Sequence, residues 1–200
     1  MMKINKITDL GQGRHKITLE DDSAFVLYKK EMKKWEIAEG TCLSEEDFTS
    51  IKQDILLKRA KKRGLYLLEK QGRSKSNLMA KLQEGLYPDD VIEQAIVYIE
   101  SFGYLNDENL ARSMVESRRT QKSYREIVAA LQSKGIKQEI IGQVMEEHYH
   151  EEYEKEAIQY LMNKKRIHLE TITPQEKNKF FHYLARKGFF YDSIKGFLKG

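Results

Sequence analysis

The chain has 200 residues, of which 40% are hydrophobic and 33% charged, with 35 Lys and Arg against 31 Asp and Glu. This composition is typical of a globular chain that can bury a core, and it argues against a disordered or collagen-like protein. The single cysteine, Cys42, excludes an internal disulfide and a cysteine-only metal cluster. Since no apolar run approaches the roughly 20 residues that span a bilayer, and the start lacks a signal-peptide core, we expect a cytoplasmic protein.

Residues 1–45 carry strand signals. Apolar and polar residues alternate over 17–19 and again over 25–27, and residues 21–23 supply a turn, which predicts a β-hairpin. Lys3–Ile7 and Trp35–Ala38 are candidates for further short strands.

Two short motifs flank this hairpin. Gly11-Gln12-Gly13 is interpreted as a turn, because the remaining glycine and lysine of a phosphate-binding loop are missing. Ser44 is followed by three acidic residues, which predicts the start of a helix.

From residue 46 onward the pattern is helical and repeats about every 50 residues. Helix starts fall at Ser74, Ser123 and Thr173, and Ser123 with Glu126 and Thr173 with Glu176 form capping boxes. Each start leads to an apolar helix that ends at a glycine, after which a further apolar helix follows. These glycines are Gly85, Gly135 and Gly188.

A further helix precedes each of these starts, at about 51–70, 107–119 and 152–164. The fold class is therefore mainly α: three tandem three-helix repeats forming an elongated curved array, preceded by a small β-hairpin region. The expected parts are a β-rich extension (1–45) and repeats at 46–105, 106–150 and 151–200. Leu82, Leu131 and Leu184 should be buried at equivalent places.

Charge is segregated along the chain. Residues 52–75 hold nine basic and two acidic side chains, whereas residues 76–110 hold one and seven. Residues 111–137 and 157–200 are again basic, and residues 138–156 are acidic. This pattern favours one or more basic faces suited to a polyanion or an acidic protein, although solvated helix faces would give a similar pattern.

The densest basic segments follow the first helix of each repeat or lie within it. Helix dipoles account for one or two cations per helix end but not for four or five. The candidate residues for binding nucleic acid or another polyanion are Lys58, Arg59, Lys61, Lys62, Arg63, Arg73, Lys75, Arg118, Arg119, Lys122, Tyr124, Arg125, Lys164, Lys165 and Arg166. If the repeats stack regularly, these residues form a row.

No catalytic constellation is visible. The histidines lack metal-ligand spacing, Cys42 has no paired histidine signature, and no Gly-x-Ser-x-Gly elbow occurs. We therefore expect no enzyme activity, no cofactor and no metal. Residues 123–147 could form a helix-turn-helix, but the second helix is acidic, which disfavours reading of a DNA groove.

A distinctive pattern occupies the centre of the chain: Phe102 to Glu108, then Ala111-Arg112, Arg118, Ile127, Leu131 and Lys134-Gly135-Ile136. Through this stretch, residues 55–200 resemble the RecX family, regulators of the bacterial recombinase RecA. In this motif we expect Asn106 to cap a helix and Tyr104-Leu105 to pack a junction between repeats.

The resemblance implies a non-enzymatic, monomeric regulator that binds the RecA–single-stranded-DNA filament, without a membrane. It would inhibit RecA ATPase, strand exchange and co-protease activity in DNA repair and the SOS response. A non-specific DNA-binding protein that acts without RecA is the alternative, and a scaffold without a nucleic-acid role is a third class. Salt-dependent binding to bare single strands would favour the DNA-binding alternative.

Overall fold

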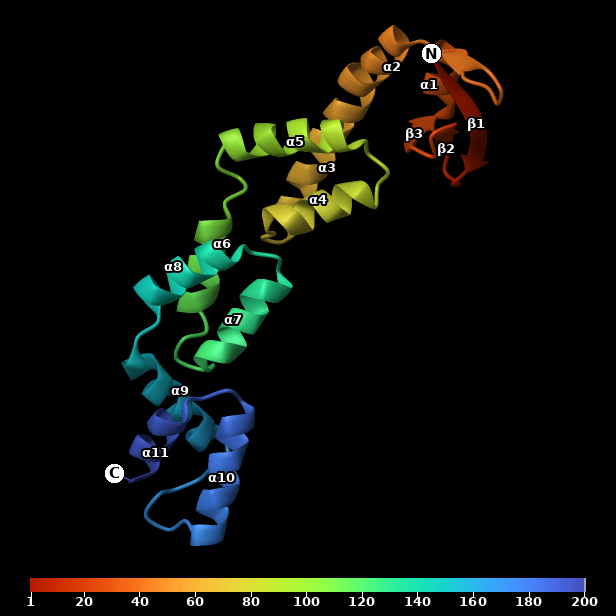
Figure 1. The fold of residues 1–200 in the computed structure, drawn as a ribbon. Coiled ribbons are helices and arrows are strands. Elements are labelled where there is room, and N and C mark those ends of the chain that lie inside the picture. Colours follow the sequence, from red (N-terminus) through yellow and green to blue (C-terminus); the bar gives the residue numbers. More distant parts are fainter. Residues whose placement is uncertain (200) are drawn as a thin grey trace. The chain divides into compact units, whose positions relative to one another are not determined.

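An antiparallel four-stranded sheet forms the beginning of the chain in the computed structural model, which describes residues 1–199 (Figure 1). Its strand order is β3-β2-β1-β4. The strands are β1 (Met2–Asp9), β2 (Arg14–Leu19), β3 (Ala24–Tyr28) and β4 (Cys42–Leu43). The expected hairpin is confirmed by pairing of Ile17 with Phe25, and the expected strand at residues 3–7 lies within β1. Residues 11–13 form the turn between β1 and β2.

The strand expected at Trp35–Ala38 is wrong. The chain leaves β3 into a short helix, α1 (Lys29–Lys34), at whose start the Tyr28 amide donates to the Glu31 carboxylate at 2.7 Å. After α1 the backbone turns, with Glu36 at a φ of 50° and the Ile37 amide donating to the Met32 carbonyl. A left-handed residue cannot continue a strand, so the last strand forms further on, at Cys42–Leu43.

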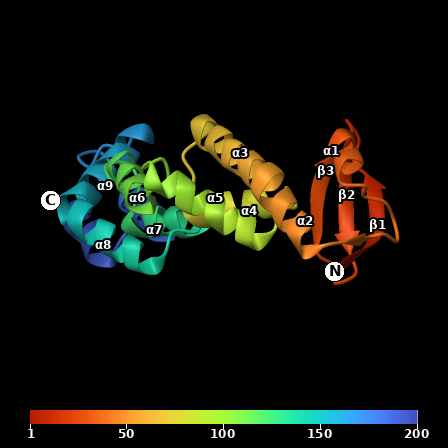
Figure 2. The same ribbon diagram turned by 90° about the horizontal axis from the view of Figure 1, so that it is seen from above.

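A long helical segment leads from the sheet into the first repeat. It consists of α2 (Glu45–Ile51), a π-helical turn (Lys52–Leu56) and α3 (Leu57–Lys70), which follow one another in line in Figure 2. Ser44 caps α2 by accepting from the Asp47 amide, as expected. In the π turn the Leu57 amide donates to the carbonyl of Lys52, five residues earlier.

One hydrophobic core joins the sheet to this helix. Ile17 and Phe25 from the sheet belong to the same buried cluster as Ile51 and Leu57 from the helix and Val91 from α5 (Asp89–Ser101). The sheet and the first repeat are therefore packed as one body, within the compact unit that spans Met1–Leu105.

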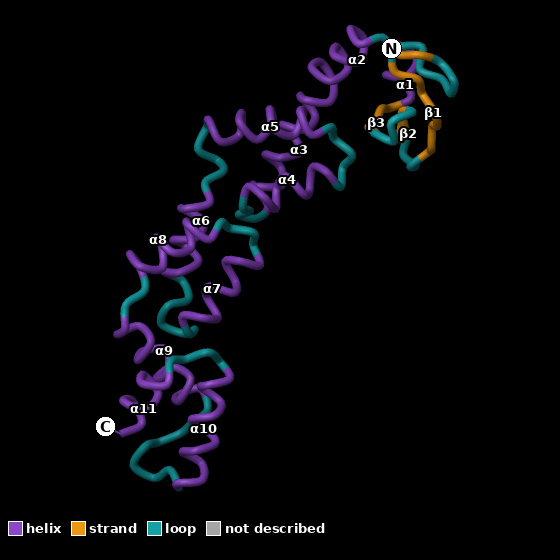
Figure 3. The backbone as a smooth tube through the Cα atoms, viewed as in Figure 1, coloured by secondary structure: helices purple, strands orange, loops and turns teal. Residues whose placement is uncertain are grey.

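The remaining helices form three consecutive helix triplets, which Figure 3 shows as coiled segments joined by short connections. The first triplet, α3–α5, completes the first unit, and a second compact unit begins at Asn106. The helices not yet named are α4 (Lys75–Gln83), α6 (Asp107–Glu116), α7 (Tyr124–Ser133), α8 (Gln138–His148), α9 (Glu151–Lys164), α10 (Pro174–Arg186) and α11 (Tyr191–Lys199). Gly200, the last residue expected in the third repeat, lies outside the described residues.

The expected helix starts are confirmed. Ser74, Ser123 and Thr173 each accept a hydrogen bond from an amide in the first turn of the helix that follows, and the latter two form complete capping boxes. The helix expected at 107–119 is shorter, because α6 ends at Glu116 and the chain continues in tight turns. Leu82, Leu131 and Leu184 are fully buried, each in the core of its own triplet.

Candidate nucleic-acid interface

The basic cluster at residues 58–63 lies on α3, and half of it faces solvent. Lys58, Lys62 and Arg63 are exposed, and Lys58 pairs with Asp54 at 3.4 Å. Lys61 is half-buried, with its ammonium group 4.1 Å from the centroid of the Tyr98 ring. Lys62 and Arg63 make no ion pair with any described residue, so their charges are directed at solvent.

Arg59 has a structural role within the same cluster. Its Nη2 donates to both carboxylate oxygens of Glu31, at 2.6 and 2.8 Å, and its Nη1 donates to the Val26 carbonyl at 3.0 Å. The guanidinium lies over the Tyr28 ring, 4.7 Å from its centroid. Charge-assisted bonds of this kind are among the stronger ones in proteins, so Arg59 braces the sheet against α3.

Arg73 lies between α3 and α4, Lys75 is the first residue of α4, and both are engaged internally. Arg73 donates to the Leu67 carbonyl near the end of α3 and to the Asn77 side chain. Lys75 pairs with Glu100 at 2.9 Å. Arg73 thus adds a second donor to the Leu67 carbonyl, which also accepts from the Gln71 amide at the end of α3.

The cluster at residues 118–125 connects α6 to α7 and is built into the fold. Arg119 donates to the His148 carbonyl at the end of α8, and its guanidinium lies 4.1 Å from the centroid of the Tyr153 ring. Arg118 and Arg119 are half-buried, whereas Lys122 and Arg125 are exposed.

The exposed cations of this connection also have local partners. Lys122 pairs with Glu126 at 3.6 Å, and the Arg125 guanidinium lies 5.5 Å from the centroid of the Phe190 ring. Tyr124 packs between Tyr149 and Phe190, with ring centroids 5.4 and 5.9 Å away, so its ring is used for packing.

The start of α7 is also the contact between the second and third triplets. The Ser123 hydroxyl donates to the Lys187 carbonyl at 2.7 Å, and the Lys187 ammonium lies 3.1 Å from the Glu126 carboxylate. That carboxylate raises the pKa of Lys187. Gly188 has a φ of 85°, and a Cβ there would lie 2.9 Å from that of Arg125. We call this arrangement the α7–α10 joint.

A buried carboxylate lies on the third-triplet side of this joint. Glu154 is 3% exposed and accepts hydrogen bonds from the Phe190 amide and the Ser193 hydroxyl, both at 3.2 Å. Burial raises the pKa of Glu154. Burial and the charge of Glu154 also raise the pKa of Tyr149, which donates to the Lys122 carbonyl. Both groups position helices rather than offer charge to a ligand.

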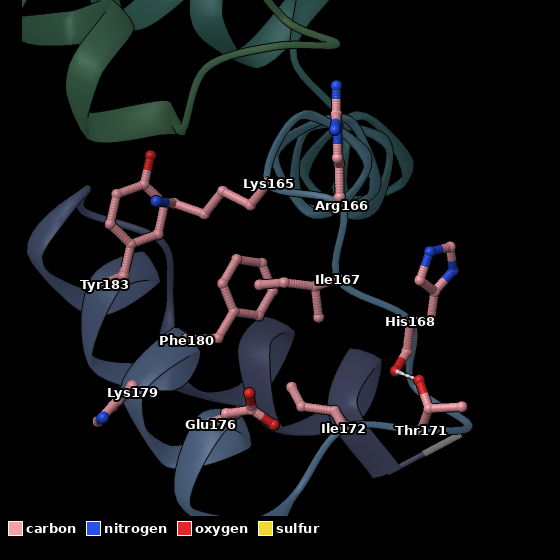
Figure 4. A pocket seen from close by; sticks show the side chains of 10 residues that line it. All are labelled: Lys165, Arg166, Ile167, His168, Thr171, Ile172, Glu176, Lys179, Phe180 and Tyr183. Atoms are coloured by element: carbon pink, nitrogen blue, oxygen red, sulfur yellow. Dashed lines mark hydrogen bonds between the residues drawn. The ribbon is translucent and has the colours of Figure 1, made fainter.

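The third cluster, Lys164 to Arg166, lies at the end of α9 and just after it, and its residues are exposed. It borders a pocket of about 450 Å³, in which Lys165 extends toward the Tyr183 ring while Arg166 points away from the pocket (Figure 4). Phe180 contributes apolar surface to this pocket, and Glu176 contributes a carboxylate. Hydrogen bonds from Thr173 lower the pKa of Glu176, so the pocket carries both signs of charge.

The structure brings the fifteen candidate residues together only in part. The clusters 118–125 and 164–166 occupy the same place in consecutive triplets, and Arg73 and Lys75 occupy that place in the first. The continuous cationic row stays a prediction. Among the predicted residues, Arg59, Arg73, Arg119 and Tyr124 are committed to internal contacts.

Sequence reasoning missed the partners of these residues. Lys187 lies 61 positions from Glu126, and Glu154 lies 36 positions from Phe190. Local sequence patterns do not predict contacts over such separations. The capping box at Ser123 was visible in the sequence, but its second hydrogen bond, to Lys187, was not.

Residues 1–199 hold no group of three or more His, Cys, Asp or Glu side chains arranged to bind a metal ion. Within the same residues, no helix is both long and apolar enough to cross a bilayer.

Known proteins are similar to this chain in sequence and in fold. Residues 106–145 match the family model described as RecX, second three-helix domain. Regulatory protein RecX of Caldanaerobacter subterraneus is 29% identical over 160 residues, which cover 80% of this chain and 79% of the relative. Regulatory protein RecX of Clostridium botulinum is 25% identical over 209 residues, covering 100% of this chain and 96% of the relative.

A solved crystal structure of regulatory protein RecX has a TM-score of 0.61 and 23% identity and covers 100% of both chains, which indicates the same fold. The family model matches the segment around Asn106, which accepts from the Asn109 amide and caps α6 as the resemblance led us to expect. Sequence and fold thus agree, and both are similar to those of the RecX family.

Proposed function

We propose that this chain is a non-enzymatic regulator that binds the RecA–single-stranded-DNA filament. It would inhibit RecA ATPase, strand exchange and co-protease activity in DNA repair and the SOS response. Similarity to the RecX family carries the proposal, because relatives across the full length of the chain are named regulatory protein RecX. The proposal includes a cytoplasmic, monomeric protein whose triplets form an elongated, curved array.

The distribution of uncompensated charge supports a polyanionic partner. Lys62 and Arg63 on α3 and the run from Lys164 to Arg166 are exposed, and none of them pairs with a carboxylate anywhere in the described chain. Cations that project into solvent can release counterions when they meet phosphates, which drives association with nucleic acids.

These exposed clusters are better targets for a test than residues 118–122. Glu at Arg118, Arg119 and Lys122 would remove most filament binding and leave the fold nearly intact only if all three side chains were exposed. Arg118 and Arg119 are half-buried and Arg119 bonds to the His148 carbonyl, so that variant would also disturb packing.

The test is RecA ATPase on single-stranded DNA, with and without this protein. The wild type should inhibit ATPase in proportion to its ratio to filament sites or ends. Lys164→Glu with Lys165→Glu should weaken inhibition and leave the melting temperature nearly unchanged, because surface substitutions usually cost little. Lys29→Glu with Lys30→Glu, on exposed positions of α1, is the matched control and should inhibit like the wild type. An unchanged ATPase rate with wild-type protein would reject the proposal.

The second candidate is a non-specific DNA-binding protein that acts without RecA. The same exposed cations favour it. Tight, salt-dependent binding to bare strands, combined with no preference for preformed filaments, would select it over the filament regulator.

A further inference from the structure

A groove of about 700 Å³ lies between the sheet and the first triplet, within the unit Met1–Leu105. One wall comes from the sheet, through Arg14 of β2 and Tyr28 of β3. The other comes from Lys62, Arg63 and Tyr66 of α3, and the turn between α4 and α5 contributes Tyr87. The volume lies within the range of roughly 300–1,000 Å³ that is usual for ligand sites.

The two walls are held rigidly relative to one another. The sheet and the long helix share a hydrophobic core, and Arg59 joins Glu31 and Val26 on the sheet side to α3. Arg59 is therefore neutralised by Glu31, and the groove exists before any ligand arrives.

The charge that remains in the groove is positive. Glu84, its one acidic lining residue, pairs with Lys81 at 2.7 Å. Arg14, Lys62 and Arg63 are exposed and make no ion pair with any residue from 1 to 199. Three uncompensated cations along one groove match the spaced phosphates of a nucleic-acid strand.

Tyrosine rings alternate with these cations. The Tyr28 and Tyr66 side chains are 40% and 48% exposed, one on each wall. Arg59 lies over the Tyr28 ring, and the Arg63 guanidinium lies 5.6 Å from the centroid of the Tyr66 ring. Exposed rings beside cations are how proteins bind unpaired strands, because every base offers a face on which a ring can stack.

We propose that this groove binds a short unpaired nucleic-acid strand, whose bases stack on Tyr28 and Tyr66 and whose phosphates contact Arg14, Lys62 and Arg63. The proposal builds on the nucleic-acid role in the proposed function, but it requires only an unpaired strand and no recombinase. It gives the N-terminal sheet a role as one wall of the site. A duplex would fit less well, since its bases already stack on one another.

The test is fluorescence anisotropy of a labelled oligothymidylate of roughly ten nucleotides with the full chain. Tyr66→Leu should weaken binding about tenfold, and Tyr66→Phe should bind like the wild type because it keeps the ring. Tyr191→Leu is the matched control: Tyr191 is 60% exposed on a helix, with the Lys195 ammonium 5.6 Å from its ring centroid, as Lys70 is 5.5 Å from that of Tyr66. It should bind like the wild type.

A second variant tests the charge separately. Arg14→Glu with Lys62→Glu should weaken binding at low salt and reduce its salt dependence. Unchanged oligonucleotide binding by this variant or by Tyr66→Leu would overturn the proposal that the groove binds an unpaired strand. Competition by polyglutamate as effective as that by unlabelled oligothymidylate would also overturn it, in favour of an acidic protein.

These outcomes are separable from the proposed function. If wild-type protein leaves RecA ATPase unchanged, the proposed filament role fails. The anisotropy experiment still tests whether the groove binds an unpaired strand. If Tyr66→Leu loses the oligonucleotide but inhibits RecA fully, the groove stands and the filament contact lies elsewhere.

Discussion

The basic cluster of α3 and that of the α6–α7 connection are similarly dense in sequence but differ in how far they are committed to internal contacts. On α3, Lys62 and Arg63 extend into solvent without a carboxylate partner among the described residues. In the connection, Arg119 bonds to the His148 carbonyl, and Lys122 pairs with Glu126.

Position relative to helix ends explains this difference. Residues in the middle of a helix have their backbone groups satisfied, so a cation there has no internal acceptor to meet unless a neighbouring element supplies one. The last carbonyls of a helix have no partner within the helix, and cations close to such an end can donate to them. Arg119 does so at the end of α8.

The largest effects should come from the cores beneath the two clusters. Leu131→Ala in α7 and Leu82→Ala in α4 should each cost about 2–5 kcal/mol, because both side chains are fully buried. Chemical denaturation measures the loss. Either variant being as stable as the wild type would contradict the alignment of the triplets.

Next in size is the loss of the Ser123 hydroxyl. Ser123→Ala removes the side-chain cap of α7, which lowers stability by about 1 kcal/mol. The variant also removes the hydrogen bond from Ser123 to the Lys187 carbonyl, which lowers stability by about 1–3 kcal/mol more. Thr173→Ala, at an exposed capping box, should cost only the first of these amounts. Equal losses in thermal melts would show that the α7–α10 joint adds nothing.

Substitutions in the two basic clusters should affect different properties, stability in the α6–α7 connection and nucleic-acid binding on α3. Arg119→Ala should lower stability by about 1–2 kcal/mol, because it removes a charged donor from the His148 carbonyl and the contact with Tyr153. Lys62→Ala should change stability by less than about 0.5 kcal/mol but should weaken binding to single-stranded DNA. A loss of stability in the Lys62 variant, or no loss in the Arg119 variant, would contradict the structural role of Arg119 and the solvent-facing role of Lys62.

A smaller effect should depend on pH. Burial raises the pKa of Glu154 in the folded chain above its ordinary value. As pH rises through the interval between these two values, the folded state binds more protons than the unfolded state, so stability falls. Glu154→Gln should therefore lack this fall, so the stability of the wild type relative to this variant should decrease as pH rises above the ordinary value of about 4.5, which denaturation at a series of pH values measures. Parallel curves for the two proteins would exclude the effect.

Local signals predicted the helical part of the fold well. The caps at Ser123 and Thr173 involve contacts three residues apart, and the buried leucines follow from apolar periodicity. Trp35–Ala38 was assigned wrongly because its apolar pattern resembles a strand, whereas the segment before it is a helix, whose first turn the bond from the Tyr28 amide to Glu31 closes.

The candidate site was less predictable. Composition identified where cations are dense, but whether a cation is free depends on partners far along the chain, such as Glu31 for Arg59. The groove combines Arg14, Tyr28 and Tyr66, which only the packing of the sheet on α3 brings together.

The π-helical turn at Lys52–Leu56 has a consequence for how this chain can tolerate changes in length. Buried Ile51 and Leu56 are five residues apart, and in a regular α-helix, at about 100° per residue, that spacing would turn them well away from one another. The wider turn absorbs one residue and keeps both side chains in the core shared with the sheet. Loss of one residue here would leave a regular helix with both flanking faces in register, whereas the same deletion within α3 would rotate the sheet about the helix axis by about 100° and dismantle the groove.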